Sequence, residues 1–308
     1  MNLFRIQNNS KHSDDPKRTF QYCIDNKILG LGYAVDSEHD ITNWDEYTRL
    51  AKNIYNKSNI NYDNFYTVER MHEKVKSGDF CWTRSPDGEY YLAKATSGWY
   101  YKYNNEEIDI VNVFNAEIKI VPIDDVPGKV ISSFRAPCAF QSIKSKPALI
   151  YSQFLWNKLN GINYKNKNTD VNDNIDAKGY GLWDLIDNED VEDLIFIKLQ
   201  MDGYIVIPHS RKKDTMSYEF YLIHKDKKNR AIVQTKTGGS AINRDDYKNR
   251  PETVYLFQPK KNYEGSPAEN ITEIESEALE MFIENNQRII PGKILNMYKC
   301  YKDILKNL

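Results

Sequence analysis

Two kinds of hydrophobic pattern follow one another along the chain and predict different structures. In residues 42–56, apolar side chains recur at helical spacing, which predicts an amphipathic helix. Residues 79–121 hold short aromatic and β-branched runs separated by turn residues, which predict strands joined in hairpins. Helical spacing returns at 146–159 and at 188–200, and strand-like runs follow the second of these segments. The pattern therefore predicts a strand-rich first part and a second part in which helices precede strands.

At 308 residues the chain is long enough for two domains, each with its own hydrophobic core. We expect an α+β N-terminal domain over residues 1–144, built on a small β-barrel or bent sheet. We expect a C-terminal α/β domain over residues 145–308, with a mixed central sheet flanked by helices. At a finer level, the run VISSF at 130–134 predicts a strand, and Thr272 with Glu275 predicts a capping box that begins a helix.

Composition limits the classes of protein to consider. Hydrophobic residues make up 40% of the chain, and no apolar run approaches the roughly 20 residues that a membrane span needs. The N-terminal segment is polar and lacks the apolar core of a secretory signal, so we expect a cytoplasmic protein without membrane contact. The four cysteines stand singly, without metal-ligand spacing, which favours reduced thiols. The net charge of −2 does not favour nucleic-acid binding, but such binding needs only a local basic surface.

The stretch 203–239 carries the most informative polar residues. With period-two alternation, Glu219 lies on one face of its strand, and Gln234 and Lys236 share one face of the next strand. The acid and the Gln-x-Lys pair are therefore expected to meet at one end of a hairpin. Glu192 lies on the preceding predicted helix, on the side that its apolar residues bury, and we expect that helix to pack nearby. Taken alone, Glu192 is typical of an acid that the helix dipole favours in a first turn.

This arrangement resembles the PD-(D/E)xK nucleases, in particular the Mrr-like restriction endonucleases, over approximately residues 146–308. Their sites combine an acid on a helix, an acid at the second strand and Gln-x-Lys or Glu-x-Lys on the third. The resemblance implies a restriction-endonuclease-like α/β domain and a role for each matching residue. These are Glu192 as the helix acid, Glu219 as a metal ligand, Gln234 as a second ligand or water-positioning group, the backbone carbonyl of Thr235 as a further ligand, and Lys236 as the group that stabilises charge or orients the attacking water.

Phosphodiester hydrolysis explains why such a site uses these residue types. Negative charge grows on a phosphate that is already anionic, so the site needs a hard cation held by oxygen ligands and a fixed positive group. The resemblance implies Mg²⁺, with Mn²⁺ as a substitute. Two residues depart from the family, since Glu219 stands where Asp is commoner and Gln234 replaces a carboxylate. Asp214 is the alternative ligand if the strand register differs, and Lys236 is otherwise an ordinary edge-strand lysine.

Basic residues flank the strand that begins near Glu219. They would contact DNA phosphates without reading the base sequence, although each run taken alone is typical of a solvated turn. They are Arg211, Lys212 and Lys213 before the strand, and Lys225, Lys227, Lys228 and Arg230 after it.

Residues 20–125 combine an ILGLGY strand, helices and an aromatic hairpin. This order resembles the N-terminal modules of bacterial defence nucleases and, more loosely, the PUA/EVE barrels that read modified bases in a pocket. The resemblance implies a pocket for a flipped base or a nucleotide, lined by aromatic side chains on which the base stacks. The candidates are Trp44, Trp82, Trp99 and Tyr101, each of which is otherwise a core or rim aromatic.

These resemblances imply a Mg²⁺-dependent DNA endonuclease of a bacterial restriction or antiphage system. The first domain would recognise a modified base, a DNA feature or a nucleotide signal. A double-strand cutter with one site per chain needs a second copy, so a homodimer is the expected assembly. The alternative is a catalytically inactive protein that uses the same fold to hold nucleic acid or a partner.

Overall fold

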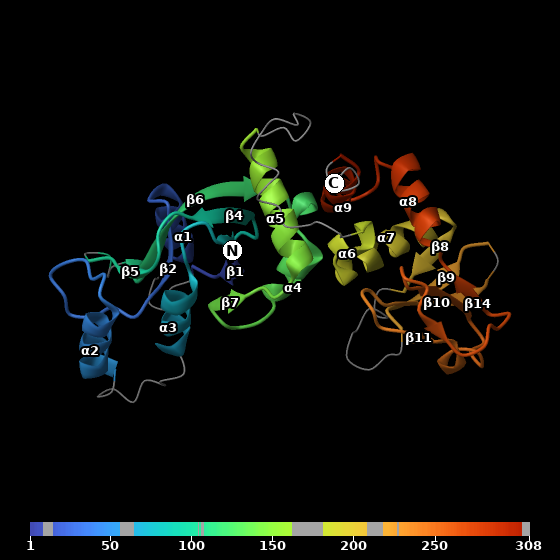
Figure 1. Cartoon of the computed structure of the whole chain (residues 1–308), viewed down its shortest axis with the longest axis horizontal. Coiled ribbons are helices and arrows are strands. Elements are labelled where there is room, and N and C mark those ends of the chain that lie inside the picture. Colours follow the sequence, from blue (N-terminus) through green and yellow to red (C-terminus); the bar gives the residue numbers. More distant parts are fainter. Residues whose placement is uncertain are drawn as a thin grey trace. The chain divides into compact units, whose positions relative to one another are not determined.

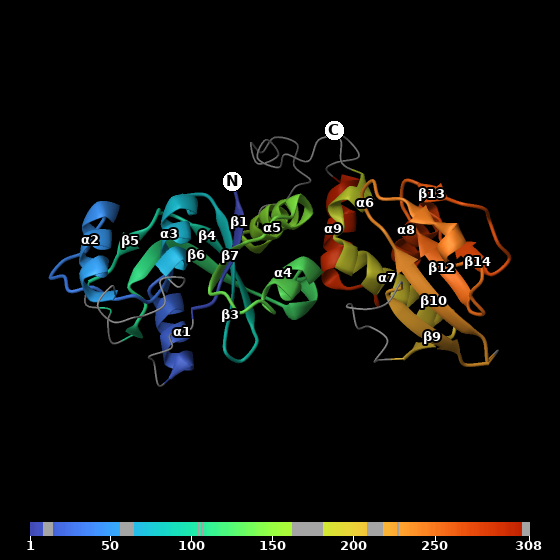
Figure 2. The ribbon, with the colours of Figure 1, turned by 90° about the horizontal axis from the view of Figure 1, so that it is seen from below.

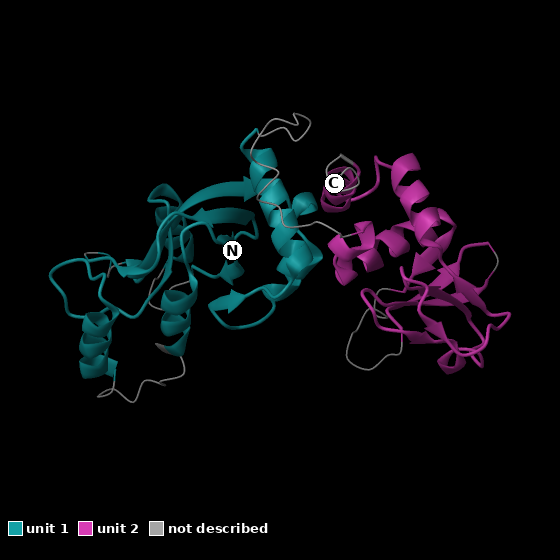
Figure 3. Cartoon of the chain, viewed as in Figure 1, with its two compact units in different colours: residues 1–163 teal, residues 164–308 magenta. Residues whose placement is uncertain are grey.

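The computed structural model describes residues 1–8, 15–55, 65–103, 105, 108–161, 181–207, 218–226 and 228–303. The chain divides into two compact units, residues 1–163 and 164–308 (Figure 3). Each unit combines a β-sheet with helices, as the alternation of patterns in the sequence predicts. Among the described helices, none has the length and apolar character needed to cross a membrane.

A curled mixed sheet forms the centre of the first unit (Figure 1). Its strands are β1 (Leu3–Ile6), β2 (Ile28–Leu31), β3 (Phe80–Arg84), β4 (Tyr90–Ala95), β5 (Tyr100–Tyr101), β6 (Asn112–Val121) and β7 (Phe140–Ser142). Their order is β2-β6-β4-β3-β1-β7, and β5 also pairs with β6. Strands β1 and β3 run parallel, whereas the other pairings are antiparallel. A bent sheet in an α+β unit agrees with the sequence-based expectation.

The curl of this sheet follows from the length of β6. Its first four residues pair with β2, and the residues from Ala116 onward pair with β4, so one continuous strand serves two ladders. The two backbones approach closely at Gly30. A Cβ atom there would meet the carbonyl oxygen of Asn112 and would lie 2.7 Å from the side chain of Val113. The glycine of the ILGLGY run is therefore required for the pairing of β2 with β6.

Helices lie against both faces of the curled sheet. They are α1 (Pro16–Asp25), α2 (Trp44–Tyr55), α3 (Phe65–Lys74), α4 (Gly128–Ser133) and α5 (Lys146–Leu159). Helices α2 and α3 bury Tyr47 and Met71 in a core that also contains Phe4 and Phe114 from the strands. The segment 130–134, expected as a strand, is instead mostly helical in α4. Its Val130 is buried, and a turn at Pro127 begins the helix.

Helix α5 has the bounds that the sequence predicts but belongs to the first unit. Trp82 Nε1 donates a hydrogen bond to Ser152 Oγ at 3.0 Å, and the rings of Phe80 and Trp156 lie 5.9 Å apart. Helix α5 therefore covers the face of β3 that bears Phe80 and Trp82. The boundary between the two units lies after residue 163, whereas the sequence-based expectation placed it after residue 144.

A five-stranded mixed sheet forms the centre of the second unit (Figure 2). Its strands are β8 (Tyr204–Val206), β9 (Phe220–His224), β10 (Arg230–Thr235), β12 (Thr253–Phe257) and β14 (Ile271–Glu273). Strands β8, β9 and β10 are antiparallel neighbours, whereas β10, β12 and β14 run parallel. Two short strands, β11 (Ile242–Asn243) and β13 (Tyr263–Glu264), pair separately.

The two faces of this sheet are covered by different elements. Helices α6 (Leu182–Leu185) and α7 (Asn188–Met201) cover one face. There the ring centroids of Trp183 and Phe257 lie 5.1 Å apart, and those of Phe196 and Phe220 lie 5.8 Å apart. On the other face, Tyr247, which comes from the segment between β10 and β12, belongs to a separate apolar cluster. Helices α8 (Ser276–Asn285) and α9 (Gly292–Asp303) complete the unit. The mixed central sheet agrees with expectation.

The predicted capping box at Thr272 and Glu275 is wrong. Thr272 lies within β14, where it pairs with Tyr255 of β12. Helix α8 begins only at Ser276, after Glu275, which makes no side-chain capping bond. Pairing with an existing sheet edge thus outweighs the local preference for a helix start.

We predict that Trp156→Ala destabilises the protein by about 3–5 kcal/mol, because a buried aromatic side chain is removed from between α5 and β3. Lys158→Ala on the same helix is the matched control. Its side chain is 48% exposed and forms a 3.7 Å ion pair with Asp125, so the expected change is within about 1 kcal/mol. Denaturant unfolding followed by far-UV circular dichroism measures both. Equal effects of the two substitutions would contradict the assignment of α5 to the first core.

Candidate functional site

The register of β9 against β10 places Glu219 opposite Gln234. Phe220 pairs with Val233 and Tyr221 with Ile232, so the next residues outward are Glu219 and Gln234. The backbone N–H of Glu219 donates to the carbonyl of Val233 at 2.7 Å, which continues the ladder. Gln234 Nε2 donates to Glu219 Oε1 at 3.2 Å. The predicted meeting of these two side chains at the open end of the hairpin is confirmed.

The amide nitrogen of Gln234 lies between two oxygens that the resemblance assigns to a metal. It donates to Glu219 Oε1 and also to the backbone carbonyl of Thr235 at 3.0 Å. Gln234 is 6% exposed and Thr235 is 1% exposed, whereas Glu219 is partly exposed to solvent. The two oxygens therefore converge on a point that now carries the partial positive charge of an amide N–H₂ group. The side chain of Thr235 points to the opposite face of the sheet, so only its backbone carbonyl belongs to this cluster.

These groups fit the requirements of a magnesium ion. Rotation of the Gln234 amide would exchange its nitrogen for its oxygen, giving three oxygens from Glu219, Gln234 and Thr235. Mg²⁺ is commonly held by one or two carboxylates, with water and substrate phosphate completing its coordination. Within the described ranges, no group of three or more His, Cys, Asp or Glu side chains is arranged to hold a metal. Glu219 would thus be the carboxylate ligand in a set completed by amide and carbonyl oxygens.

Lys236 follows this cluster directly. Its backbone N–H donates to the carbonyl of Phe257 at 3.0 Å, so the parallel ladder continues one residue beyond β10. The side chain of Lys236 is exposed. Since it lies two residues after Gln234 in extended chain, it projects from the same face of the strand. An exposed cationic group therefore extends from the end of the sheet where Glu219 lies.

Glu192 does not share this face. Its carboxylate is 4% exposed and accepts a hydrogen bond from Asn188 Nδ2 at 2.6 Å, one helical turn earlier. Phe196, one turn further along α7, packs on Phe220, whose side chain points to the face opposite that of Glu219. The expectation that α7 brings Glu192 beside Glu219 and Gln234 is corrected accordingly. Strand alternation places the helix on the other side of the sheet.

The face that bears Glu219 is apolar and aromatic. Tyr221 lies two residues beyond Glu219 on the same face and packs on a cluster that contains Ile232 and Tyr247. Burial raises the pKa of the Tyr247 hydroxyl, and the negative charges of Asp246 and Glu219 raise it further. The Glu219 charge therefore acts across an apolar surface, where electrostatic interactions are stronger than in water.

The predicted basic residues are less favourably placed. Lys225, Lys228 and Arg230 are exposed at the closed end of the β9–β10 hairpin. Six residues of extended chain separate Lys225 from Glu219, which corresponds to about 20 Å. These three are therefore not beside the site, contrary to expectation. Arg211, Lys212, Lys213, Lys227 and the alternative ligand Asp214 lie outside the described residues.

The four predicted pocket aromatics divide between two faces of the first sheet. Trp44, Trp99 and Tyr101 belong to the core beneath α2 and α3, where Trp44 and Trp99 lie 5.0 Å apart. Trp99 and Tyr101 are buried, and the Tyr101 hydroxyl donates to the carbonyl of Val35 at 2.9 Å. Trp44 is partly exposed and stacks on His72 with ring centroids 4.2 Å apart. Trp82 points to the opposite face, toward α5, so the structure does not bring all four together.

The sequence-based interpretation missed a group of cations in the first unit. Arg70, Lys74, Lys129 and Lys144 line one cavity there, although they come from three separate segments. A local pattern cannot reveal such a cluster. The available signal is that residues 126–169 contain no Asp or Glu but seven Lys and Arg.

We predict that Gln234→Glu makes the stability of the second unit dependent on pH. The two facing carboxylates would repel each other, so the folded state would raise the pKa of the pair above its unfolded value. A raised pKa favours the protonated pair in the folded state, so stability should fall by about 1–3 kcal/mol as the pH rises from 5 to 8. Thermal unfolding in EDTA measures this dependence.

Gln234→Met is the matched control for this substitution, because it keeps the length of the side chain without adding a charge. It should show no additional dependence on pH. In buffer without EDTA, added Mg²⁺ should restore the stability of Gln234→Glu at pH 8, because a divalent cation between the two carboxylates offsets their repulsion. An identical pH dependence in the two variants would contradict the close approach of residues 219 and 234.

The end of the sheet at Glu219 thus gathers a carboxylate, a side-chain amide and a backbone carbonyl, with a lysine two residues beyond the amide. Hard oxygen ligands beside a cationic side chain suit the binding of a phosphate through a divalent cation. No family model, curated protein or solved structure matches the chain.

Proposed function

We propose that this chain is a cytoplasmic, Mg²⁺-dependent DNA endonuclease of a bacterial restriction or antiphage defence system, with its cutting site at Glu219, Gln234 and Lys236. The observation that carries the proposal is the convergence of Glu219 Oε1 and the Thr235 carbonyl on the Gln234 amide, at 3.2 and 3.0 Å. Lys236 follows at the end of the same strand. Mn²⁺ is the expected substitute metal, because it accepts the same oxygen ligands.

The order of elements in the second unit supports this proposal. Helix α7 precedes three antiparallel strands, with the acid at the start of the second strand and Gln-x-Lys at the end of the third. A further strand, β12, then adds in parallel to the third. This is the order on which the resemblance to Mrr-like PD-(D/E)xK nucleases rests. In this chain Glu192 would support α7 through Asn188 and would not touch the substrate.

Each residue of the site has a distinct chemical task in the proposed reaction. A bound divalent cation would polarise the scissile phosphate and lower the pKa of a water molecule. Glu219 and the Thr235 carbonyl would hold that cation, and Gln234 would contribute its amide oxygen or orient the water. The ammonium group of Lys236 would lie against the non-bridging oxygens and stabilise the charge that grows on them.

The first unit would recognise a modified base, a DNA feature or a nucleotide signal. Of its four candidate aromatics, Trp44 is the one that combines partial exposure with a stacking partner, at 4.2 Å from His72. A base could stack on such a surface, whereas the side chains of Trp82, Trp99 and Tyr101 are buried in the protein. Cutting both strands with one site per chain would require a homodimer on DNA.

The rival function is a catalytically inactive nucleic-acid-binding or partner-binding protein with the same fold. The specific observation in its favour is that Gln234 supplies no carboxylate and donates its amide to Glu219. An amide bridge of this kind holds the sheet end together without a metal. The two functions differ in whether phosphodiester bonds are cut.

We predict that Lys236→Ala and Glu219→Ala each lower Mg²⁺-dependent plasmid cleavage by about 100-fold or more, because each removes a charge that stabilises the transition state. Lys248→Ala is the matched control, since Lys248 is exposed in the same unit and forms a surface ion pair with Asp245 at 3.1 Å. The assay uses modified, unmodified and single-stranded DNA in turn.

Cleavage that survives Lys236→Ala and Glu219→Ala would exclude this site. Absence of cleavage by the unaltered protein on every DNA form, with either Mg²⁺ or Mn²⁺, would favour the inactive binding protein.

A further inference from the structure

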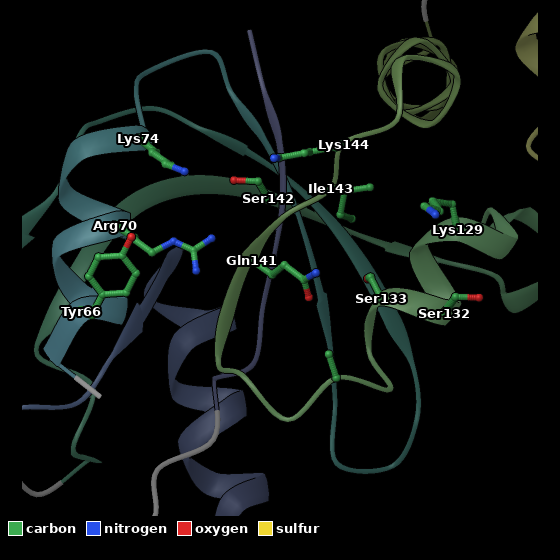
Figure 4. Close-up of a pocket in the computed structure, with 11 residues that line it drawn as sticks. Tyr66, Arg70, Lys74, Lys129, Ser132, Ser133, Gln141, Ser142, Ile143 and Lys144 are labelled. Atoms are coloured by element: carbon green, nitrogen blue, oxygen red, sulfur yellow. The ribbon is translucent and has the colours of Figure 1, made fainter. Parts of the chain in front are cut away.

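A cavity of about 640 Å³ opens in the first unit between α3, α4 and the segment around β7 (Figure 4). Ligand sites in proteins commonly have volumes of about 300–1,000 Å³. Arg70 and Lys74 extend from α3 toward Gln141 and Ser142, and Lys144 extends from the opposite side (Figure 4). The cavity is thus large enough for a ligand and is lined mostly by polar side chains.

The lining is cationic. Arg70, Lys74, Lys129 and Lys144 contribute positive charges, and no Asp or Glu belongs to the lining. Within the described part of the chain, none of these four side chains forms an ion pair with a carboxylate. Four cations that converge without counter-charges repel one another, so a bound anion would lower their energy.

A second hollow of about 580 Å³ continues this surface. It shares Lys74, Ser142 and Lys144 with the first and adds Lys76 and Lys146. Glu73 is its acidic member. Together the two hollows form a groove, which we call the cationic groove, with six basic side chains and one acidic side chain. An elongated polyanion matches such a groove better than a single small anion does.

Behind the lining residue Gln141 lies a buried charge that lacks an acidic partner. Arg5 is fully buried, and its guanidinium donates to neutral acceptors, namely the carbonyls of Ala136 and Cys138, the sulfur of Cys138 and Gln141 Oε1. No described carboxylate forms an ion pair with it. Burial lowers the pKa of the Arg5 guanidinium, which reflects the cost of desolvating this charge.

Gln141 contacts Arg5 and also lines the groove, so Arg5 sets the orientation of an amide that faces the groove. A guanidinium has only donors, so the Gln141 oxygen must face Arg5, at 3.3 Å from its Nη2. The amide N–H₂ group of Gln141 is consequently left to face other groups, and Gln141 lines the cavity. A fixed donor backed by a buried cation is suited to a phosphate oxygen.

The rim of the groove adds an aromatic surface. Tyr66 is 58% exposed, and the guanidinium of Arg70 lies 5.6 Å from the centre of its ring. Bases of single strands stack on such aromatic side chains while neighbouring cations contact their phosphates. This combination distinguishes a nucleic-acid strand from an acidic peptide, which offers no stacking surface to Tyr66.

We propose that the cationic groove binds the phosphodiester backbone of a nucleic-acid strand, with Gln141 and the lysines on phosphate oxygens and Tyr66 beneath a base. This site lies wholly in the first unit and does not depend on cutting by the second. The net charge of −2 is compatible with such a site, because the relevant charge is local.

The test measures binding of the full chain to fluorescein-labelled DNA, single-stranded and duplex, by anisotropy in EDTA over a range of salt concentrations. The double variant Lys129→Ala/Lys144→Ala should weaken binding at least about 10-fold. It should also make the slope of log K against log salt less negative by about 1.4 for single strands or 1.8 for duplex, the loss of two phosphate contacts. The control Lys52→Ala/Lys119→Ala removes two lysines that do not line the groove and should change neither quantity.

A second variant, Gln141→Glu, separates binding from folding. It gives buried Arg5 a carboxylate partner, so the melting temperature should rise, while the negative charge in the lining should abolish the contribution of the groove to DNA binding. Equal losses in the lysine double variant and its control, or unchanged affinity in the groove variants, would overturn the proposal. Because EDTA prevents metal-dependent cutting, failure here is distinguishable from failure of the nuclease site.

Discussion

The pairing of β10 with neighbours on both of its edges decides where the polar side chains of the second unit point. Successive residues of a strand project to opposite faces, so a shift of one residue would exchange Gln234 with Val233 and bury a polar amide beneath α7. Phe220, Phe257 and Val233 fix the register because they bury apolar surface on the helix side. Glu219, Gln234 and Lys236 are left at the other face as a consequence.

The alternation of side chains along a strand also decides which face each residue occupies in the first unit. In β3, Cys81 faces the core beneath α2 and α3, whereas Trp82 faces α5 and donates to Ser152 at 3.0 Å. Trp82 is therefore separated from Trp44, Trp99 and Tyr101 by the thickness of the sheet. The many aromatic side chains lie largely in two cores. Trp44 and Tyr66, at the edges of the unit, keep accessible ring surface.

Both sites combine a buried polar centre with exposed cations. In the second unit, the shielded Gln234 amide holds two oxygens together and Lys236 projects into solvent. In the first unit, the buried guanidinium of Arg5 holds the side chain of Gln141. Lysines line the same cavity as Gln141. A buried centre is rigid because its hydrogen bonds cannot be exchanged for water, whereas exposed lysines adjust to a ligand. This division suits the positioning of phosphate groups.

Most helices and strands, and the pairing of β9 with β10, are predictable from local sequence patterns, whereas α4 and the start of α8 are not. Helical spacing predicts α5 with its observed bounds, and period-two alternation predicts that Glu219 meets Gln234, because both signals come from neighbouring residues. Tertiary contacts set which unit α5 joins, which face of the sheet α7 and its Glu192 cover, and how far the basic turn lies from the site. The tertiary structure also assembled the cationic groove from α3, α4 and the segment around β7, which are up to about 80 residues apart in the chain. Such placements depend on which apolar faces are buried against each other, and no local pattern encodes that choice.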